Sequence, residues 1–235
     1  MMGEGILGRE YTGNSFMSLL NILQNILIYT IPILFAITVH EVAHGWVANK
    51  LGDPTANLLG RLTLNPIRHI DPIGTILIPG LLFFTTGFIF GWAKPVPIVW
   101  RNLRSPRRDV ALVASAGPIA NLMMAVLWGL ISKLGGMLYA GTAMGMSVAM
   151  VEMGKIGMQI NLVLMVLNLI PIPPLDGSRV VASFLRGSLA YYYARIEPFG
   201  LVILLLLLSL QMLNAMIWPV VAMLQQHLTT LLGLY

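Results

Sequence analysis

Long apolar runs alternate with short segments rich in proline and basic residues, a pattern typical of a chain that crosses a membrane several times. Four runs predict transmembrane helices, at residues 16–49, 110–134, 156–170 and 199–213. As a helix the first run is about 50 Å long, against roughly 30 Å for the hydrocarbon layer, so it must tilt, project or bend at Pro32. A final segment from Trp218 onward predicts an interfacial or extra helix. We therefore expect an all-α polytopic membrane protein.

Residues 73–90 form a further apolar segment, which Pro79 and Gly80 interrupt. Basic residues flank it on both sides, and short basic loops stay on the cytoplasmic face of a membrane. With both flanks on one face, the segment enters and leaves by that face as a re-entrant hairpin, whose backbone has to be buried in protein. The alternative is an ordinary span with one basic loop outside.

The segment 90–97, which follows the hairpin, contains Pro95 and Pro97. In an extended strand, residues two apart face the same side, so both missing N–H groups would lie along one edge. The other edge would stay free to pair with the backbone of a substrate. The sequence thus predicts a short β element here, with a proline-rich loop that merely turns the chain as the alternative.

The amino-acid composition supports a membrane protein and limits the residue types that could bind a metal ion. The chain is 57% hydrophobic and 10% charged, which excludes an ordinary soluble domain. Its net charge of +5 comes from basic blocks between apolar runs, which suit cytoplasmic loops and give no reason to expect nucleic acid. No cysteine is present, so any zinc would be held by histidine and carboxylate. We expect a polar tail at residues 1–15 and one domain at 16–235.

The first predicted helix carries the sequence His-Glu-Val-Ala-His at residues 40–44. Positions four apart share one face of a helix, so His40 and His44 can present two imidazoles to one metal ion. Glu41 can take the proton of an attacking water. A zinc site of this kind needs a third protein ligand and an open fourth position. With the membrane interface at Lys50, His40 lies about 15 Å inside the membrane.

A third ligand is predicted at Asp176. The prolines that precede it end a helix, and the basic residues that follow place the next loop in the cytoplasm, so Asp176 returns to the membrane face of His44. The alternative is that Asp176 only caps the next helix. A rival ligand set would use His69 or Asp71, which lie on the same face.

These motifs resemble the site-2 protease family of intramembrane zinc metalloproteases. Residues 40–44 match its zinc and catalytic motif, and Asn-Leu-Ile-Pro-Ile-Pro-Pro-Leu-Asp-Gly at 168–177 matches its second motif. Residues 90–97 and Gly117-Pro118 further resemble the compact bacterial-type branch, which lacks PDZ and CBS domains. The small residues around 117 also allow close helix packing. The resemblance covers residues 31–210, the expected core of the domain.

The resemblance implies one Zn²⁺ per chain, with His40, His44 and Asp176 as its ligands. It implies Glu41 as the general base and Asn168 as a polar group near the substrate carbonyl. The expected activity is hydrolysis of peptide bonds within or near the transmembrane helices of other membrane proteins. We expect a multi-pass protein of the cell membrane whose active site faces the cytoplasm. Two alternatives are a membrane metal transporter and a relative that binds helices without cleaving them.

Overall fold

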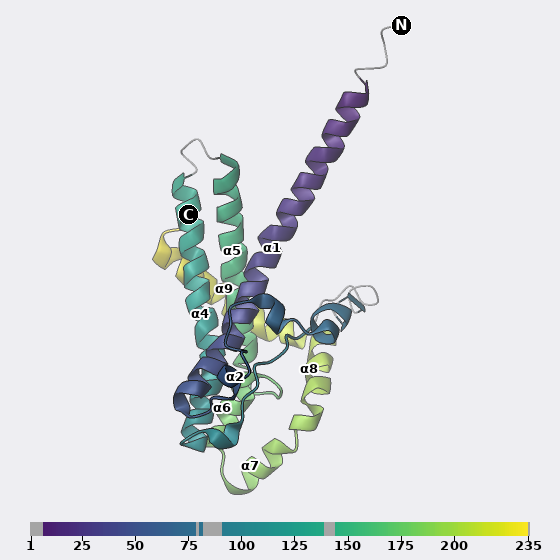
Figure 1. Cartoon of the computed structure of the whole chain (residues 1–235). Coiled ribbons are helices and arrows are strands. Elements are labelled where there is room, and N and C mark those ends of the chain that lie inside the picture. Colours follow the sequence, from purple (N-terminus) through teal and green to yellow (C-terminus); the bar gives the residue numbers. More distant parts are fainter. Residues whose placement is uncertain (1–6, 79, 82–90, 139–143, 235) are drawn as a thin grey trace.

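A computed structural model describes residues 7–78, 80–81, 91–138 and 144–234 (Figure 1). Within these ranges the regular structure is helical and no strand occurs. The longer helices are α1 (Leu7–Leu51), α4 (Pro106–Leu138), α5 (Met144–Asn168), α6 (Asp176–Phe184), α7 (Gly187–Ala194), α8 (Gly200–Ser209) and α9 (Met212–Leu232). The short ones are α2 (Thr55–Leu58), η1 (Pro66–His69), η2 (Pro72–Leu77), η3 (Trp100–Asn102) and η4 (Glu197–Phe199).

Four stretches of helix are long and apolar enough to cross a membrane: Ile22–Leu51, Pro106–Leu138, Gly145–Asn168 and Gly187–Ser209. The predicted all-α polytopic fold with four spans is therefore confirmed, and the chain is a multi-pass membrane protein. The fourth span begins earlier than the predicted residue 199, because α7, η4 and α8 follow one another directly. It ends where Gln211 adopts a left-handed conformation.

Helix α1 begins at Leu7, so the polar tail expected at residues 1–15 is already helical over its second half. Proline is absent between Leu7 and Pro32, and nothing else in this stretch forces the helix to begin later. The sequence predicts that a first helix longer than the hydrocarbon layer tilts, projects or bends. Figure 1 shows that α1 is tilted and that its N-terminal part projects beyond α4 and α5.

Helices α4 and α5 pack side by side and antiparallel, and small residues allow them to approach closely. A Cβ atom on Gly154 would lie 2.6 Å from the backbone nitrogen of Ser132, and one on Gly157 would lie 2.4 Å from the indole of Trp128. Where helices share the same lipid surroundings, such close contact is a main source of attraction. This pair forms the centre of the bundle.

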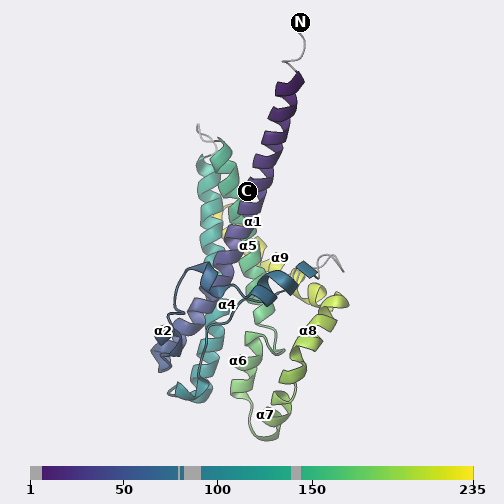
Figure 2. The same ribbon diagram turned by 45° about the vertical axis from the view of Figure 1, so that its right-hand side comes forward.

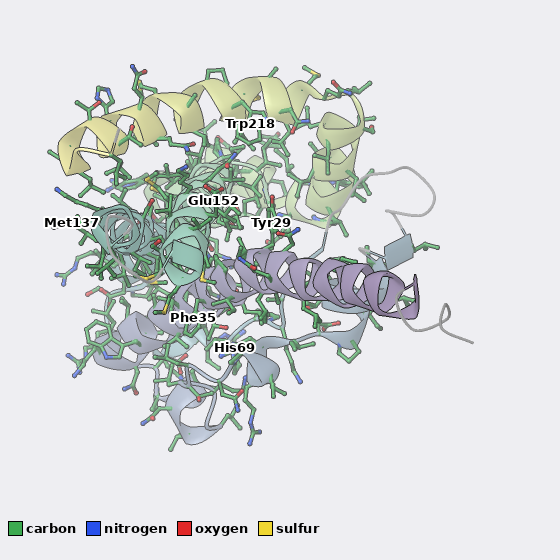
Figure 3. The ribbon with its side chains drawn as sticks, turned by 90° about the horizontal axis from the view of Figure 1, so that it is seen from above. Tyr29, Phe35, His69, Met137, Glu152 and Trp218 are labelled. Atoms are coloured by element: carbon green, nitrogen blue, oxygen red, sulfur yellow. The ribbon has the colours of Figure 1, made fainter. Side chains whose placement is uncertain are left out.

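The C-terminal helix α9 crosses this pair. Figure 3 shows α4 and α5 almost end-on and α9 lengthwise beside them. Leu213, Ile217 and Val221 of α9 are buried in the same core cluster as Trp128 and Met158. By contrast, Figures 1 and 2 show α7 and α8 standing apart from α4 and α5.

Asp53 organises the polar segment after α1. Its side chain is fully buried and accepts hydrogen bonds from both the backbone and the hydroxyl of Thr55, from Val99 N (2.7 Å) and from Asn102 Nδ2 (2.8 Å). Burial alone would raise the pKa of Asp53, but these donors outweigh it and lower the pKa below the usual value. The carboxylate thus ties residues 99–102 to the end of α1.

The predicted re-entrant hairpin at 73–90 lies partly outside the described residues. Its described beginning is the short π-helical segment η2, with Asp71 accepting from the N–H groups of Ile73 and Gly74 at 2.9 and 2.8 Å. The chain from residue 91 to 99 is extended and has no paired strand.

Candidate metal centre

Three side chains from two distant parts of the chain converge on one point. The Nε2 atoms of His40 and His44 lie 3.0 Å apart, and each lies 3.2 Å from Oδ2 of Asp176. His40 and His44 are buried on one face of α1, as their spacing predicts, while Asp176 opens α6. Two nitrogens and one oxygen are therefore held together inside the membrane domain.

The turn between α5 and α6 delivers Asp176. Gly177 allows α6 to begin against the end of α5, because a Cβ atom there would lie 2.3 Å from the carbonyl oxygen of Leu169. Leu175 is the N-cap of α6 and no side chain caps this helix. The carboxylate of Asp176 thus faces the histidines, and the alternative in which it merely caps α6 is not what the structure has.

The two histidines favour the ionised form of Asp176. Burial acts to raise the pKa of Asp176, but hydrogen bonds from His40 and His44, and the charge that these rings carry when protonated, outweigh burial and hold the pKa well below its usual range. A carboxylate has to be ionised to bind a metal.

Helix α4 forms the back wall of the site through three residues spaced four apart. Val113 O lies 2.7 Å from His44 Nδ1, and Asn121 Oδ1 lies 2.6 Å from His40 Nδ1. Gly117 lies between them, and a Cβ atom there would be only 2.4 Å from His44 Nε2. The imidazoles can occupy their positions only because residue 117 has no side chain.

The donor set fits a zinc ion. Ligands at about 2.0–2.1 Å from a tetrahedral zinc ion are about 3.4 Å from one another, close to the observed 3.0–3.2 Å. A carbonyl can only accept, so His44 Nδ1 carries a proton, and in the neutral imidazole His44 Nε2 keeps a lone pair for a metal ion. Lone pairs and a carboxylate that face one point repel each other, and a cation between them removes that repulsion. Three protein ligands leave a fourth position for water or substrate.

Glu41 is half-buried beside this cluster. Its Oε2 atom accepts a hydrogen bond of 2.8 Å from the backbone N–H of Val96, which belongs to the extended segment after the predicted hairpin. Val96 also packs on α1, since a Cβ atom on Gly45 would lie 2.6 Å from Val96 Cγ1. The segment around residue 96 thus orients the carboxylate that the sequence predicts as general base.

The extended segment does not offer the free edge that its prolines predicted. Its alternate N–H groups are already used within the chain: Trp92 N donates to Gly74 O (3.0 Å), Lys94 N to His69 O (2.9 Å) and Val96 N to Glu41. The prediction of a donor edge left for substrate is therefore wrong. The prolines remove donors from one side, and the other side packs against η1, η2 and α1.

The remaining candidates make hydrogen bonds to other parts of the chain. Asn168 donates a 3.0 Å hydrogen bond to Leu164 O of its own helix, so its proposed contact with a substrate carbonyl stays a prediction. His69 is buried with Nε2 2.9 Å from Thr63 O, and Asp71 caps η2. Among the residues that the structure describes, only His40, His44 and Asp176 are grouped closely enough to share a metal ion.

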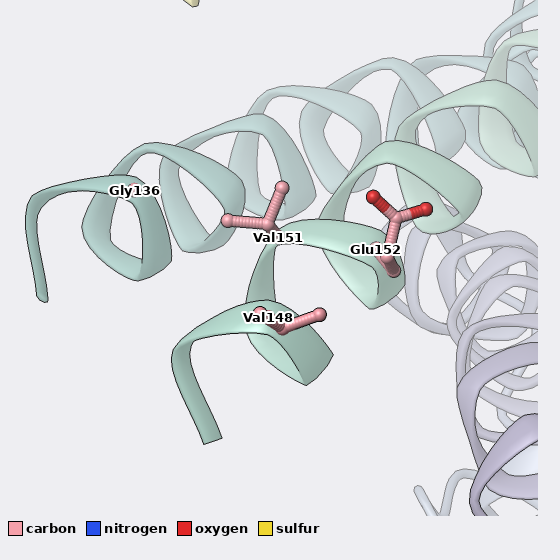
Figure 4. Close-up of a pocket in the computed structure, with 4 residues that line it drawn as sticks. All are labelled: Gly136, Val148, Val151 and Glu152. Carbon is pink, nitrogen blue, oxygen red and sulfur yellow. The ribbon is translucent and has the colours of Figure 1, made fainter. Parts of the chain in front are cut away.

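A shallow pocket at the other end of the bundle carries no such chemistry. It is lined by Gly136, Val148, Val151 and Glu152 of α4 and α5 (Figure 4). Gly136 is 15 residues, about 22 Å along α4, from Asn121. Glu152 pairs there with Lys155 at 3.1 Å.

Sequence reasoning identified the ligand candidates but missed the partners behind them. The sequence suggests only helix packing for Gly117 and gives no role to Asn121, whereas both lie against the histidines. It likewise gives no role to Asn161, which contacts Asn121. The available signal was a pair of asparagines inside apolar spans, where polar groups are costly unless they are paired.

The fold and site define a membrane-embedded zinc metalloprotease of the site-2 protease type, and comparisons with known proteins agree. Residues 129–210 match the model described as Peptidase family M50. "Putative zinc metalloprotease YwhC" of Bacillus subtilis is 38% identical over 193 residues, covering 80% of this chain and 83% of that protein. The chain belongs to peptidase family M50.

Two further relatives carry the name "Putative zinc metalloprotease Rip2". The protein of Mycobacterium tuberculosis H37Rv is 32% identical over 193 residues, covering 80% of this chain and 69% of the relative. That of Mycolicibacterium smegmatis is 30% identical over 182 residues, covering 77% of this chain and 66% of the relative. No solved structure was found to be similar to the chain.

Proposed function

We propose that this metalloprotease cleaves peptide bonds within or next to the transmembrane helices of other membrane proteins. The observation that carries the proposal is the convergence of His40, His44 and Asp176 on one point within a bundle of membrane-spanning helices. His40 is ten residues before Lys50, which corresponds to about 15 Å along α1. A substrate that reaches this depth has to enter through the lipid bilayer.

His40, His44 and Asp176 hold one zinc ion in this proposal. When bound, zinc supplies a Lewis acid that polarises the scissile carbonyl and makes water acidic enough to attack it. The burial of both histidines excludes bulk water from their side of the site, which strengthens the electrostatic effect of every charge there.

Glu41 acts as the general base. It lies directly after His40, so its carboxylate is next to the site, and the Val96 N–H holds it in place at 2.8 Å. Glu41 takes the proton of the attacking water and returns it to the leaving amine. Asn168 is proposed to donate a hydrogen bond to the carbonyl oxygen as negative charge develops on it, after releasing its present bond to Leu164.

The substrate helix has to unwind before it can be cut. A helix uses its carbonyl groups in its own hydrogen bonds, and in lipid no water replaces a bond that opens. Local unwinding therefore requires polar partners on the enzyme. The non-helical segments before Trp100 and between α5 and α6 carry backbone polar groups and adjoin Glu41 and Asp176. Substrates with glycine or proline near the scissile bond should be cleaved best.

The active site faces the cytoplasm of the cell in this proposal. Basic residues occur at the end of α1, before α4 and around α6 and α7, all of which lie at the same end of the bundle (Figure 1). Short loops with such an excess of lysine and arginine stay in the cytoplasm.

A pair of glutamine variants tests the activity. Glu41→Gln keeps the size of the side chain and all three ligands, so it should retain about one zinc per chain and lose cleavage of a transmembrane helix by about 10²–10⁴-fold or more. Glu152→Gln is the matched control, because Glu152 is exposed at the other end of the bundle. Zinc content and cleavage are measured on the same detergent preparation. Wild-type turnover by Glu41→Gln would remove Glu41 from the mechanism, whereas zinc binding without cleavage by the unaltered chain would favour metal transport or non-proteolytic helix binding.

A further inference from the structure

A chain of hydrogen bonds runs from the first histidine through two helices. His40 Nδ1 lies 2.6 Å from Asn121 Oδ1 on α4, and Asn121 Nδ2 donates to Asn161 Oδ1 on α5 at 2.9 Å. Asn161 Nδ2 in turn donates to Gly157 O at 2.8 Å, and Asn121 Nδ2 also donates to Ala36 O at 3.2 Å. Both asparagines are fully buried.

Two backbone carbonyls determine the direction of every bond in this chain. A carbonyl can only accept, so Gly157 O requires the NH₂ of Asn161 to face it, which turns Asn161 Oδ1 toward Asn121. Ala36 O requires the same of Asn121 independently. Asn121 therefore presents its oxygen to His40. Rotating either amide by 180° would place two oxygens against each other.

The consequence is a fixed proton position on His40. Because Asn121 Oδ1 can only accept, His40 Nδ1 has to carry a proton, and Nε2 is left with the lone pair that a metal requires. His44 reaches the same state directly through Val113 O. The two ligands are thus prepared alike, one by a backbone carbonyl and the other by a relay of two amides.

We propose that Asn121 and Asn161 are positioning residues that hold His40 in its zinc-binding tautomer and ring orientation. This inference rests on the ligand role of His40 in the proposed function. Partners behind a metal ligand fix its orientation and raise its basicity, and their removal commonly lowers metal affinity about 10–100-fold. A simpler role, hydrogen bonding that only joins α4 to α5, would leave zinc affinity unchanged.

Three variants separate these roles. Asn121→Leu, of similar volume, removes the acceptor for His40 and should lower zinc affinity about 10–100-fold, measured by competition with a chelator. Asn161→Leu leaves Asn121 held by Ala36 O, so its effect should be in the same direction and smaller. Ser132→Ala is the matched control, because it removes another buried bond between the same helices, from Ser132 Oγ to Val151 O at 3.2 Å, and should leave zinc affinity unchanged.

A measurement on the unaltered chain keeps the test decisive if Asn121→Leu does not fold. In zinc-loaded protein labelled with ¹⁵N-histidine, multiple-bond ¹H–¹⁵N spectra should show the proton of His40 on Nδ1 and the metal on Nε2. The opposite assignment, or equal loss of zinc affinity in Asn121→Leu and Ser132→Ala, would overturn the inference. His40→Ala serves as the reference: full zinc binding by that variant would refute the ligand role itself, whereas loss of zinc there with unchanged affinity in Asn121→Leu would refute only the positioning role.

Discussion

Gly117→Ala is a one-atom test of how tightly the histidines are enclosed. A Cβ atom at this position would lie 2.4 Å from His44 Nε2, 2.5 Å from His40 Cε1 and 2.7 Å from His40 Nδ1. Carbon and nitrogen atoms that are not bonded rarely approach closer than about 3.4 Å, so the rings or α4 would have to move by about 1 Å. The present separations of 3.0–3.2 Å between ligand atoms would not survive such a shift.

The size of the effect follows from the cost of overpacking. An extra methyl group in a well-packed site commonly costs about 1–3 kcal/mol. Without metal the imidazoles can rotate away from the methyl group, so we expect the strain to be concentrated in the zinc-bound state. Zinc affinity should then fall about 5- to 150-fold, and cleavage at limiting zinc should fall with it.

Gly136→Ala provides the control on the same helix. Nothing lies within 4 Å of the position that its Cβ would occupy, so the same substitution there meets open space. Zinc affinity is measured for both variants by chelator competition, and thermal unfolding of the metal-free forms shows whether the fold is retained. Unchanged zinc affinity in Gly117→Ala, or an equal loss in both variants, would refute the close packing of α4 on the histidines.

Three further predictions concern the ligand assignment, the buried Asp53 and the orientation in the membrane. Asp176→Ala should lower both zinc occupancy and cleavage, because two imidazoles remain, while His69→Ala should leave zinc in place; the reverse result would disprove the ligand assignment. Asp53→Asn should destabilise the fold by about 2–3 kcal/mol near pH 7. Since the folded state lowers the pKa of Asp53 from 3.8, its contribution is present above about pH 4, and the difference between the two proteins should shrink in acid. In this cysteine-free chain, Arg104→Cys should be shielded from an impermeant thiol reagent in intact cells and Gly136→Cys should react; the opposite labelling would invert the proposed orientation.

The spans and the ligand candidates could be predicted because they depend on local patterns. Apolar length defines a transmembrane helix whatever its neighbours are, and the spacing of His40 and His44 is set by helix geometry alone. To predict that Asp176 lies on the same membrane face as the histidines, the membrane crossings between α1 and Asp176 also had to be counted.

The contacts behind the ligands could not be predicted, because they depend on how one helix is rotated against another. A sequence does not show which face of α4 meets α1, so the contacts of Gly117 and Asn121 with the histidines could not be inferred from it. The prediction that residues 91–97 keep a free hydrogen-bonding edge was wrong for the same reason. Proline identifies the side without donors, but tertiary packing decides whether the other side stays free.

Hydrolysis inside a transmembrane helix is the central claim, and the position of the new chain ends tests it most directly. Zinc-loaded enzyme is incubated with a membrane-embedded substrate helix in H₂¹⁸O, and the products are mapped by mass spectrometry. We expect one new carboxyl terminus within or next to the apolar segment, carrying a single ¹⁸O and missing from the reaction of Glu41→Gln. Products cut only in the water-exposed flanks, or formed equally by Glu41→Gln, would contradict it.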